Sequence, residues 1–200
     1  MLLIESQLEH QNKFCTVRSL RNKITLITRS HLCFVFLLET WLLAHFSYSV
    51  LTLDDYVIYR KDRVTKGGGI LIATLKNIDH SLINIPSTCE MLGIDANLGK
   101  SRSHRFILVY NPSAGDIDYV QTLCKELTKF VIKSESYSII GDFNLPNINW
   151  ERLEMSNQKP YKLFGKLIGE ISPISQLIRF PTRENAILDL IITRETENSK

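Results

Sequence analysis

The sequence predicts an α/β fold in which helices flank a sandwich of two β-sheets. Segments with strand character outnumber segments with helical character, hairpins alternate with longer crossover connections, and no internal repeat occurs. The chain has 200 residues, of which 44% are apolar and 22% charged, a composition typical of a globular protein that buries the core of one domain.

The N-terminal part divides into a lead-in and the first elements of the domain. Residues 1–12 carry little periodic signal, so we expect a weakly structured lead-in to a single domain over 13–200. The pattern then predicts a short strand at 13–18 and a helix at 20–29. The apolar run 32–38 is far shorter than the ~20 residues that cross a membrane. It predicts a core strand that is buried on both faces.

The middle of the chain predicts two pairs of strands. Residues 55–60 predict a strand in which Tyr56 and Ile58 alternate with Val57 and Tyr59. A second strand at 70–74 follows the three glycines at 67–69, so the two form a hairpin. No Gly-Lys-Ser/Thr follows these glycines, which disfavours a phosphate-binding loop. Residues 90–97 and 105–110 form the second pair.

Helices and strands alternate in the C-terminal half. Asp116 or Asp118 can cap a helix that runs to about residue 134, because the apolar residues that follow share one helical face. The remaining predicted elements are a strand at 137–140, a helix at 162–171 and a last strand at 187–193.

Composition excludes several classes of protein. The net charge of +3 is compatible with nucleic-acid binding without requiring it. The four cysteines (15, 33, 89 and 124) are scattered and form no CxxC pair, which predicts reduced thiols in place of a zinc site or a disulfide framework. Residues 1–11 contain two glutamates and no apolar signal core, so we expect an intracellular protein that is not secreted.

The most informative motif is Gly141-Asp142-Phe143-Asn144, which follows a buried strand. Alternate residues of a strand share a face, so Asp142 and Asn144 are predicted to point the same way before Pro146 ends the strand. A carboxylate beside an amide suits attack on phosphorus, with a base for water and a donor for a phosphate oxygen. By itself, a Gly-Asp-x-Asn sequence is more often ordinary turn chemistry.

Other polar side chains also stand at strand ends, namely those of Glu39, Tyr110 and Asp189. Oxygen donors without a Cys or His cluster favour Mg²⁺ or Mn²⁺, and a divalent ion on Glu39 would neutralise a phosphate. Each residue also has a structural interpretation: a surface glutamate, a half-buried core tyrosine and a solvent-facing aspartate.

An ordered series of motifs resembles a known superfamily. The motifs are Glu39-Thr40-Trp41-Leu42, Tyr59-Arg60-Lys61-Asp62-Arg63 before the glycines, Val109-Tyr110-Asn111-Pro112, Gly141-Asp142-Phe143-Asn144, Pro181-Thr182-Arg183 and Leu188-Asp189-Leu190-Ile191. Over roughly residues 13–194, the chain resembles the endonuclease/exonuclease/phosphatase superfamily. More narrowly, it is similar to the endonuclease domain of non-LTR (LINE-type) retrotransposons, which is related to apurinic/apyrimidinic endonucleases. The resemblance implies a DNase I-like fold.

The resemblance also implies a role for each site residue. Glu39 would bind the catalytic Mg²⁺, Tyr110 would contact the scissile phosphate, and Asp142 would orient or deprotonate the attacking water. Asn144 would hold a phosphate oxygen, and Asp189 would orient a catalytic histidine on the following strand. The implied activity is nicking of nuclear DNA, which primes reverse transcription by a covalently linked domain.

Two departures from the family pattern open an alternative. Thr16 stands where the family carries an asparagine on its first strand, and the Ser-Asp-His motif expected beyond Asp189 does not occur before Lys200. We therefore expect a domain that is incomplete at its C-terminus and lacks the last strands. The alternative function is a catalytically impaired or inactive remnant that keeps the fold and weak DNA binding. A phosphatase or phosphodiesterase of the same superfamily is disfavoured by the Glu39-Thr40-Trp41-Leu42 and Pro181-Thr182-Arg183 motifs.

Basic residues near the glycines have two possible roles. Arg60, Lys61, Arg63 and Lys66 either contact DNA phosphates or form a solvated turn. Arg183 is a further candidate for contact with nucleic acid.

Overall fold

The computed structural model describes residues 2–5, 32–47, 51, 53–64, 67–99, 103–113 and 115–194. The predicted strand at 13–18, the predicted helix at 20–29 and Thr16 lie outside the described residues.

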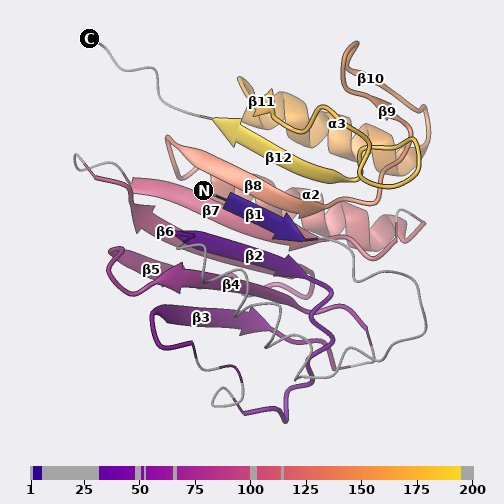
Figure 1. Cartoon of the computed structure of the whole chain (residues 1–200). Coiled ribbons are helices and arrows are strands. Elements are labelled where there is room, and N and C mark those ends of the chain that lie inside the picture. The colour runs from indigo at the N-terminus through magenta and orange to yellow at the C-terminus, as the bar shows by residue number, and fades with distance from the viewer. Residues whose placement is uncertain are drawn as a thin grey trace.

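The described strands form two large sheets and one small hairpin (Figure 1). The four-stranded sheet has the order β1-β2-β4-β3 and the six-stranded sheet has the order β11-β12-β8-β7-β6-β5, while β9 and β10 pair with each other. The bounds are β1 Leu2–Glu5, β2 Phe34–Leu38, β3 Tyr56–Lys61, β4 Ile70–Leu75, β5 His80–Ile83, β6 Glu90–Asn97, β7 Ser103–Tyr110, β8 Tyr137–Asp142, β9 Ile148–Asn149, β10 Glu154–Met155, β11 Ser175–Gln176 and β12 Asp189–Arg194.

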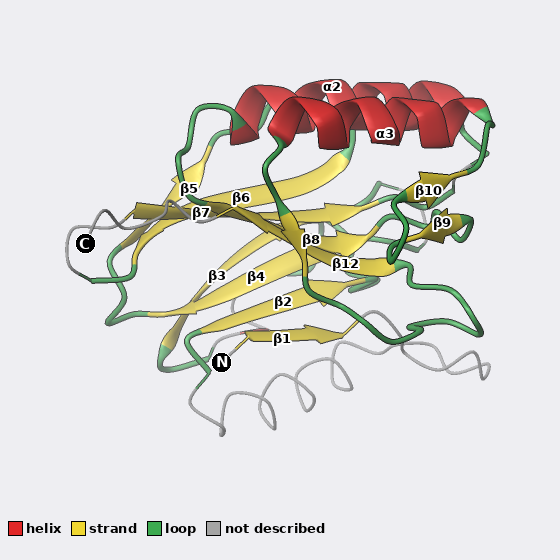
Figure 2. Ribbon diagram, turned by 90° about the horizontal axis from the view of Figure 1, so that it is seen from above, coloured by secondary structure: helices red, strands yellow, loops and turns green. Residues whose placement is uncertain are grey.

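The layers stack as helices, six-stranded sheet and four-stranded sheet. Helices α2 (Ile117–Val131) and α3 (Lys159–Ile171) lie side by side on one face of the six-stranded sheet, and the four-stranded sheet covers its other face (Figure 2). This arrangement confirms the predicted sandwich of two sheets with helices on the outside.

Strand β2 is buried along its whole length, as its continuous apolar sequence predicts. Its residues alternate between two cores, with Phe36 between the two sheets and Val35 and Leu37 on the opposite face of the four-stranded sheet. Among the described residues, no helix is long and apolar enough to span a membrane.

Helix α2 connects two neighbouring parallel strands, β7 and β8. The side chain of Asp116 caps the helix by accepting a hydrogen bond from the backbone N of Tyr119 at 3.0 Å. Leu123 and Leu127 lie on the buried face that covers the six-stranded sheet. The crossover brings the C-terminal ends of β7 and β8 to the same edge, which is where the candidate site lies.

The sequence pattern missed several elements. Leu2–Glu5 form β1, parallel to β2, within a segment for which only a weakly structured lead-in was expected. Strand β5 was not predicted, because its residues are exposed or half-buried and show no apolar pattern. Strands β9, β10 and β11 contain two residues each, which is too few to show a hydrophobic period.

Strand β8 is longer than predicted, because it continues through Gly141 and Asp142. A Cβ atom on Gly141 would lie 1.8 Å from the carbonyl oxygen of Val109, so only glycine allows β8 to approach β7 this closely. Close approach of the two strands is therefore the reason that a glycine stands immediately before Asp142.

Candidate active site

Three adjacent strands bring three candidate residues into one row. Tyr110 on β7 is the register partner of Asp142 on β8, and Asp189 on β12 is the partner of Asp142 on its other side. Direct partners in a sheet project toward the same face. Ile140, two residues before Asp142, lies between the two sheets, so this row faces the four-stranded sheet.

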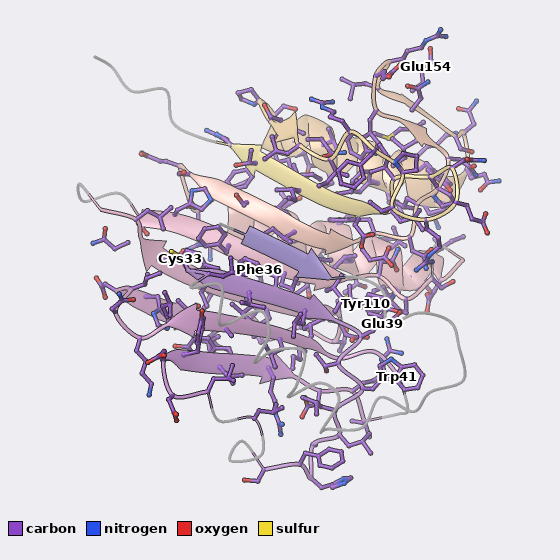
Figure 3. All side chains as sticks on the ribbon, viewed as in Figure 1. Cys33, Phe36, Glu39, Trp41, Tyr110 and Glu154 are labelled. Atoms are coloured by element: carbon purple, nitrogen blue, oxygen red, sulfur yellow. The ribbon has the colours of Figure 1, made fainter. Side chains whose placement is uncertain are left out.

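Glu39 reaches the row from the four-stranded sheet. It follows the last residue of β2, and the hydroxyl of Tyr110 donates a hydrogen bond to its Oε1 atom at 2.5 Å (Figure 3). Burial raises the pKa of Tyr110 far above its usual value, and the bond to Glu39 raises it further. Tyr110 therefore stays protonated at neutral pH and acts as a hydrogen-bond donor.

Asp142 is a buried carboxylate in a mixed electrostatic environment. Its Oδ1 atom accepts from the backbone N of Asn144 at 2.8 Å, and its Oδ2 atom lies 3.4 Å from the guanidinium of Arg183. Burial, followed by the charge of Asp189, raises the pKa of Asp142 to about 6, although the contacts with Asn144 and Arg183 oppose the rise. A carboxylate with this pKa is suited to take a proton near neutral pH.

Asn144 lies beside Asp142 for a different reason from the one predicted. The prediction that both residues alternate along one strand is wrong, since β8 ends at Asp142 and Asn144 lies in a loop with a left-handed φ of 50°. The Asp142 carboxylate caps a turn by accepting the backbone N–H two residues on, which competes with strand pairing. The side-chain amide of Asn144 donates to the carbonyl of Pro112 at 3.1 Å.

Two supporting residues, Asn111 and Thr182, were not predicted as site residues from the sequence. The backbone N of Asn111 donates to the Asp142 carbonyl at 2.8 Å and its side-chain amide donates to the Phe143 carbonyl at 2.7 Å, which fixes the peptide after Asp142. Thr182 accepts from the backbone N of both Leu188 and Asp189 at 3.0 Å and so fixes the start of β12. Both residues lie in motifs that the sequence shows, but their backbone partners are distant in the chain.

The basic residues separate into two groups. Arg183 lies at Asp142, and Arg63 lies over the ring of Tyr110, 5.8 Å from its centroid. Arg60 instead pairs with Asp62, donates to the carbonyl of Phe46, and has a side chain only 5% exposed. The structure thus places Arg63 and Arg183 at the site, whereas the guanidinium of Arg60 holds a loop.

Lys61 also makes internal contacts and is partly buried. Its ammonium group donates to the carbonyls of Ser87 and Cys89 at 2.6 and 2.8 Å. Burial lowers the pKa of Lys61 in spite of nearby acidic groups. Lys66 lies outside the described residues.

Glu90, the first residue of β6, anchors the glycine loop against the site. It is only 7% exposed, it pairs with Arg63, and its Oε2 atom accepts from the backbone N of Gly69 at 2.6 Å. The carbonyls of Gly69 and Gly68 in turn accept from the backbone N atoms of Thr40 and Trp41. The hairpin loop therefore fixes the segment that carries Glu39.

The donor set at this edge suits a hard cation. Within the described ranges, no three His, Cys, Asp or Glu side chains gather closely enough to form a complete protein cage for a metal ion. Mg²⁺ commonly uses one or two carboxylates and takes its other ligands from water and phosphate, and Glu39 can supply a carboxylate of this kind.

The cysteines of the described residues do not form disulfides. Cys33, Cys89 and Cys124 are free thiols, and Cys15 lies outside the described residues.

The chain shares a DNase I-like fold with several solved structures. The endonuclease domain of TRAS1, a telomere-specific non-LTR retrotransposon, has a TM-score of 0.63 and 11% identity, with 96% of this chain and 82% of that chain covered. The 3'-5' exonuclease NExo from Neisseria meningitidis has a TM-score of 0.61 and 13% identity, with 90% and 84% covered.

A third similar structure contains nucleic acid. D. rerio TDP2 complexed with single-strand DNA product has a TM-score of 0.60 and 10% identity, with 93% of this chain and 80% of that chain covered. No family model and no curated protein matches the chain. These likenesses establish the DNase I-like fold that the motifs predicted.

Proposed function

We propose that this chain hydrolyses phosphodiester bonds in DNA and acts as a nicking endonuclease. The observation that carries the proposal is the position of Asp142, a buried carboxylate with a pKa of about 6 that lies in register with Tyr110 and Asp189. The DNA in the similar TDP2 structure and the endonuclease identity of the TRAS1 domain support a DNA substrate.

The residues of the chain divide the chemistry among them. Asp142 takes the proton of the attacking water, because its pKa leaves it ionised yet basic at neutral pH. The Asn144 amide, which carries two N–H donors, contacts a phosphate oxygen on which charge develops, and the single O–H of Tyr110 would turn from Glu39 to a second phosphate oxygen when substrate binds. Arg183, beside Asp142, adds positive charge at the same place.

Glu39 would hold Mg²⁺ or Mn²⁺, with water and a phosphate oxygen of the substrate as the other ligands. When bound, the ion supplies positive charge to the phosphate and to the leaving oxygen. The contact between Glu39 and Tyr110 ties this ligand to the six-stranded sheet, which limits its freedom to move.

A second candidate is a DNA-binding domain without hydrolytic activity. It is favoured by the internal partners of both principal carboxylates, since Arg183 pairs with Asp142 and Tyr110 donates to Glu39. A site that satisfies its own carboxylates can keep its structure and its basic residues without turning over a substrate. This candidate predicts DNA binding with no metal-dependent cleavage.

The similarity to TRAS1 supports a narrower form of the proposal. The nick would occur in nuclear DNA and supply a primer to a reverse transcriptase linked to this domain.

Nicking of supercoiled plasmid by chain 1–200 tests the proposal. We expect nicking with Mg²⁺, no nicking with EDTA, and a loss of about 10²-fold or more in the Asp142→Ala variant. DNA binding without cleavage by the folded wild-type chain would favour the second candidate. Cleavage that survives in Asp142→Ala would refute the assignment of Asp142. Phosphate release from inositol phosphates, with intact DNA, would reassign the substrate within the superfamily.

A further inference from the structure

Trp41 is an exposed aromatic residue next to the candidate metal ligand. Its side chain is 42% exposed, whereas Thr40 before it and Leu42 after it are each 2% exposed. The other tryptophan of the chain, Trp150, is 6% exposed. The indole ring therefore points away from a segment whose neighbouring side chains are buried.

The backbone holds Trp41 in an uncommon conformation. Its φ of 55° is in the left-handed region, which bulky residues rarely adopt. The backbone N of Trp41 donates to the Gly68 carbonyl at 2.9 Å, and that of Thr40 donates to the Gly69 carbonyl at 3.1 Å. Conformations of this kind concentrate at ligand sites, where surrounding contacts impose them.

The glycine loop is itself fixed in place. A Cβ atom on Gly68 would lie 2.6 Å from the guanidinium carbon of Arg63, and one on Gly69 would lie 2.6 Å from the Thr40 hydroxyl. Glu90 holds both Arg63 and the backbone of Gly69. The exposed position of the Trp41 ring is thus imposed by a connected set of contacts that extends to β6.

The same contacts place the ring at the edge of the sheets where the candidate active site lies. Glu39, two residues earlier, also has a left-handed φ of 51° and accepts the hydroxyl of Tyr110. In Figure 3, the ring of Trp41 extends outward beside Glu39 and Tyr110. A phosphate held at Tyr110 would bring the bases of its own strand within reach of an aromatic ring at this place.

We propose that the indole of Trp41 stacks on a nucleobase next to the phosphate at which the site acts, a claim that rests on the proposed DNA substrate. Stacking suits this position because every base presents a π-face and because charged side chains lie at the same edge, Glu39 two residues before Trp41 and Arg63 over the ring of Tyr110. A nucleic acid offers phosphate for the charged groups and a flat apolar face for the indole. Trp41 would therefore select a DNA strand with an accessible base at this position.

Binding of two single strands of equal charge tests the inference. One is a 12-mer of DNA and the other is a 12-mer of tetrahydrofuran abasic units, which keeps the phosphates and lacks the bases. Titrations in EDTA measure affinity and tryptophan fluorescence without hydrolysis. We expect the DNA to quench the fluorescence of Trp41 and the abasic strand to leave it unchanged.

Variants identify the ring responsible. Trp41→Ala should weaken binding of the DNA strand about tenfold and leave binding of the abasic strand unchanged, while Trp41→Phe should retain most of the affinity. Ile132→Ala is the matched control, because Ile132 is 62% exposed and lies just beyond α2, at the end remote from the Asp116 cap. Quenching that disappears in Trp41→Phe assigns the signal to residue 41 without any change to the buried Trp150.

The outcomes separate this inference from the proposed function. Equal effects of Trp41→Ala on both strands, or no effect on either, would overturn the stacking role while plasmid nicking remained intact. Base-dependent quenching together with absent nicking would support stacking and refute hydrolysis. No binding of DNA by the folded chain would overturn both.

Discussion

At the scale of single residues, Asp142 connects the chemistry of the site to the stability of the fold. The carboxylate is 2% exposed and lies in register with the second carboxylate, Asp189. Both features disfavour the charged form and raise the pKa to about 6. The ionised form that the proposed reaction requires is therefore the less favourable form for the folded chain, a conflict typical of catalytic sites.

This conflict predicts a stabilising substitution. The folded-state pKa of Asp142 exceeds the ordinary value of 3.8, so the folded chain binds the proton more tightly and its stability falls as the pH rises from about 4 to 6. We expect Asp142→Asn to raise the free energy of unfolding by about 1–3 kcal/mol at pH 7.5 in EDTA. Urea denaturation should show the difference vanishing below about pH 3, where the carboxyl is neutral in both states.

Wild-type chain without metal is the reference for that experiment. A stabilisation that persists at low pH would show that the asparagine acts through packing or hydrogen bonding and not through the lost charge.

The sequence predicted which residues form the site more accurately than it predicted how their side chains are placed. Tyr110, Asp142 and Asp189 stand at predicted strand ends, and the register brings them together. Asn144 was expected to project from the strand, but the Asp142 carboxylate bonds its backbone and turns the chain. The structural role of Glu90 could not be predicted from the neighbouring sequence, because its partners, Arg63 and Gly69, are 27 and 21 residues away in the chain.

At the scale of elements, β8 delivers Asp142 to the site only because Gly141 lets it approach β7. The strand is parallel to β7, and their connection through α2 brings both C-terminal ends to one edge. Catalytic groups commonly gather at this edge of an open sheet. The strand extends two residues beyond the predicted 137–140, and Gly141 allows the close approach of β8 to β7.

Two glycine substitutions should therefore act in opposite directions. A Cβ on Gly141 would meet the Val109 carbonyl at 1.8 Å, so we expect Gly141→Ala to lower the free energy of unfolding by about 3 kcal/mol or more. Gly169, inside α3, has no heavy atom within 4 Å of its would-be Cβ, so Gly169→Ala should raise stability by about 0.5–1 kcal/mol. Thermal and urea unfolding of the two variants beside the wild type would measure both effects.

The pair is its own control, because each variant adds one methyl group to a glycine. Equal effects at the two positions would contradict the claim that close approach of β7 and β8 dictates Gly141.

At the scale of the whole molecule, the site forms where the two sheets meet. Glu39 comes from the four-stranded sheet, while Tyr110, Asp142 and Asp189 come from the six-stranded sheet. The sequence predicted the sandwich, because its hairpins, crossover and apolar strands follow local rules. It did not predict β1, β5 or the two-residue strands, whose pairing depends on distant partners.

The rate of plasmid nicking as a function of pH, measured with Mg²⁺ under single-turnover conditions, tests most directly the central claim that Asp142 is the base. The ionised form of Asp142 is the active one, so the rate should rise with pH and level off above an apparent pKa near or below 6, since bound metal favours ionisation. Asp142→Asn should abolish both the activity and the rise. A rate independent of pH between 4 and 8, or an Asp142→Asn variant that cleaves at the wild-type rate, would contradict the account.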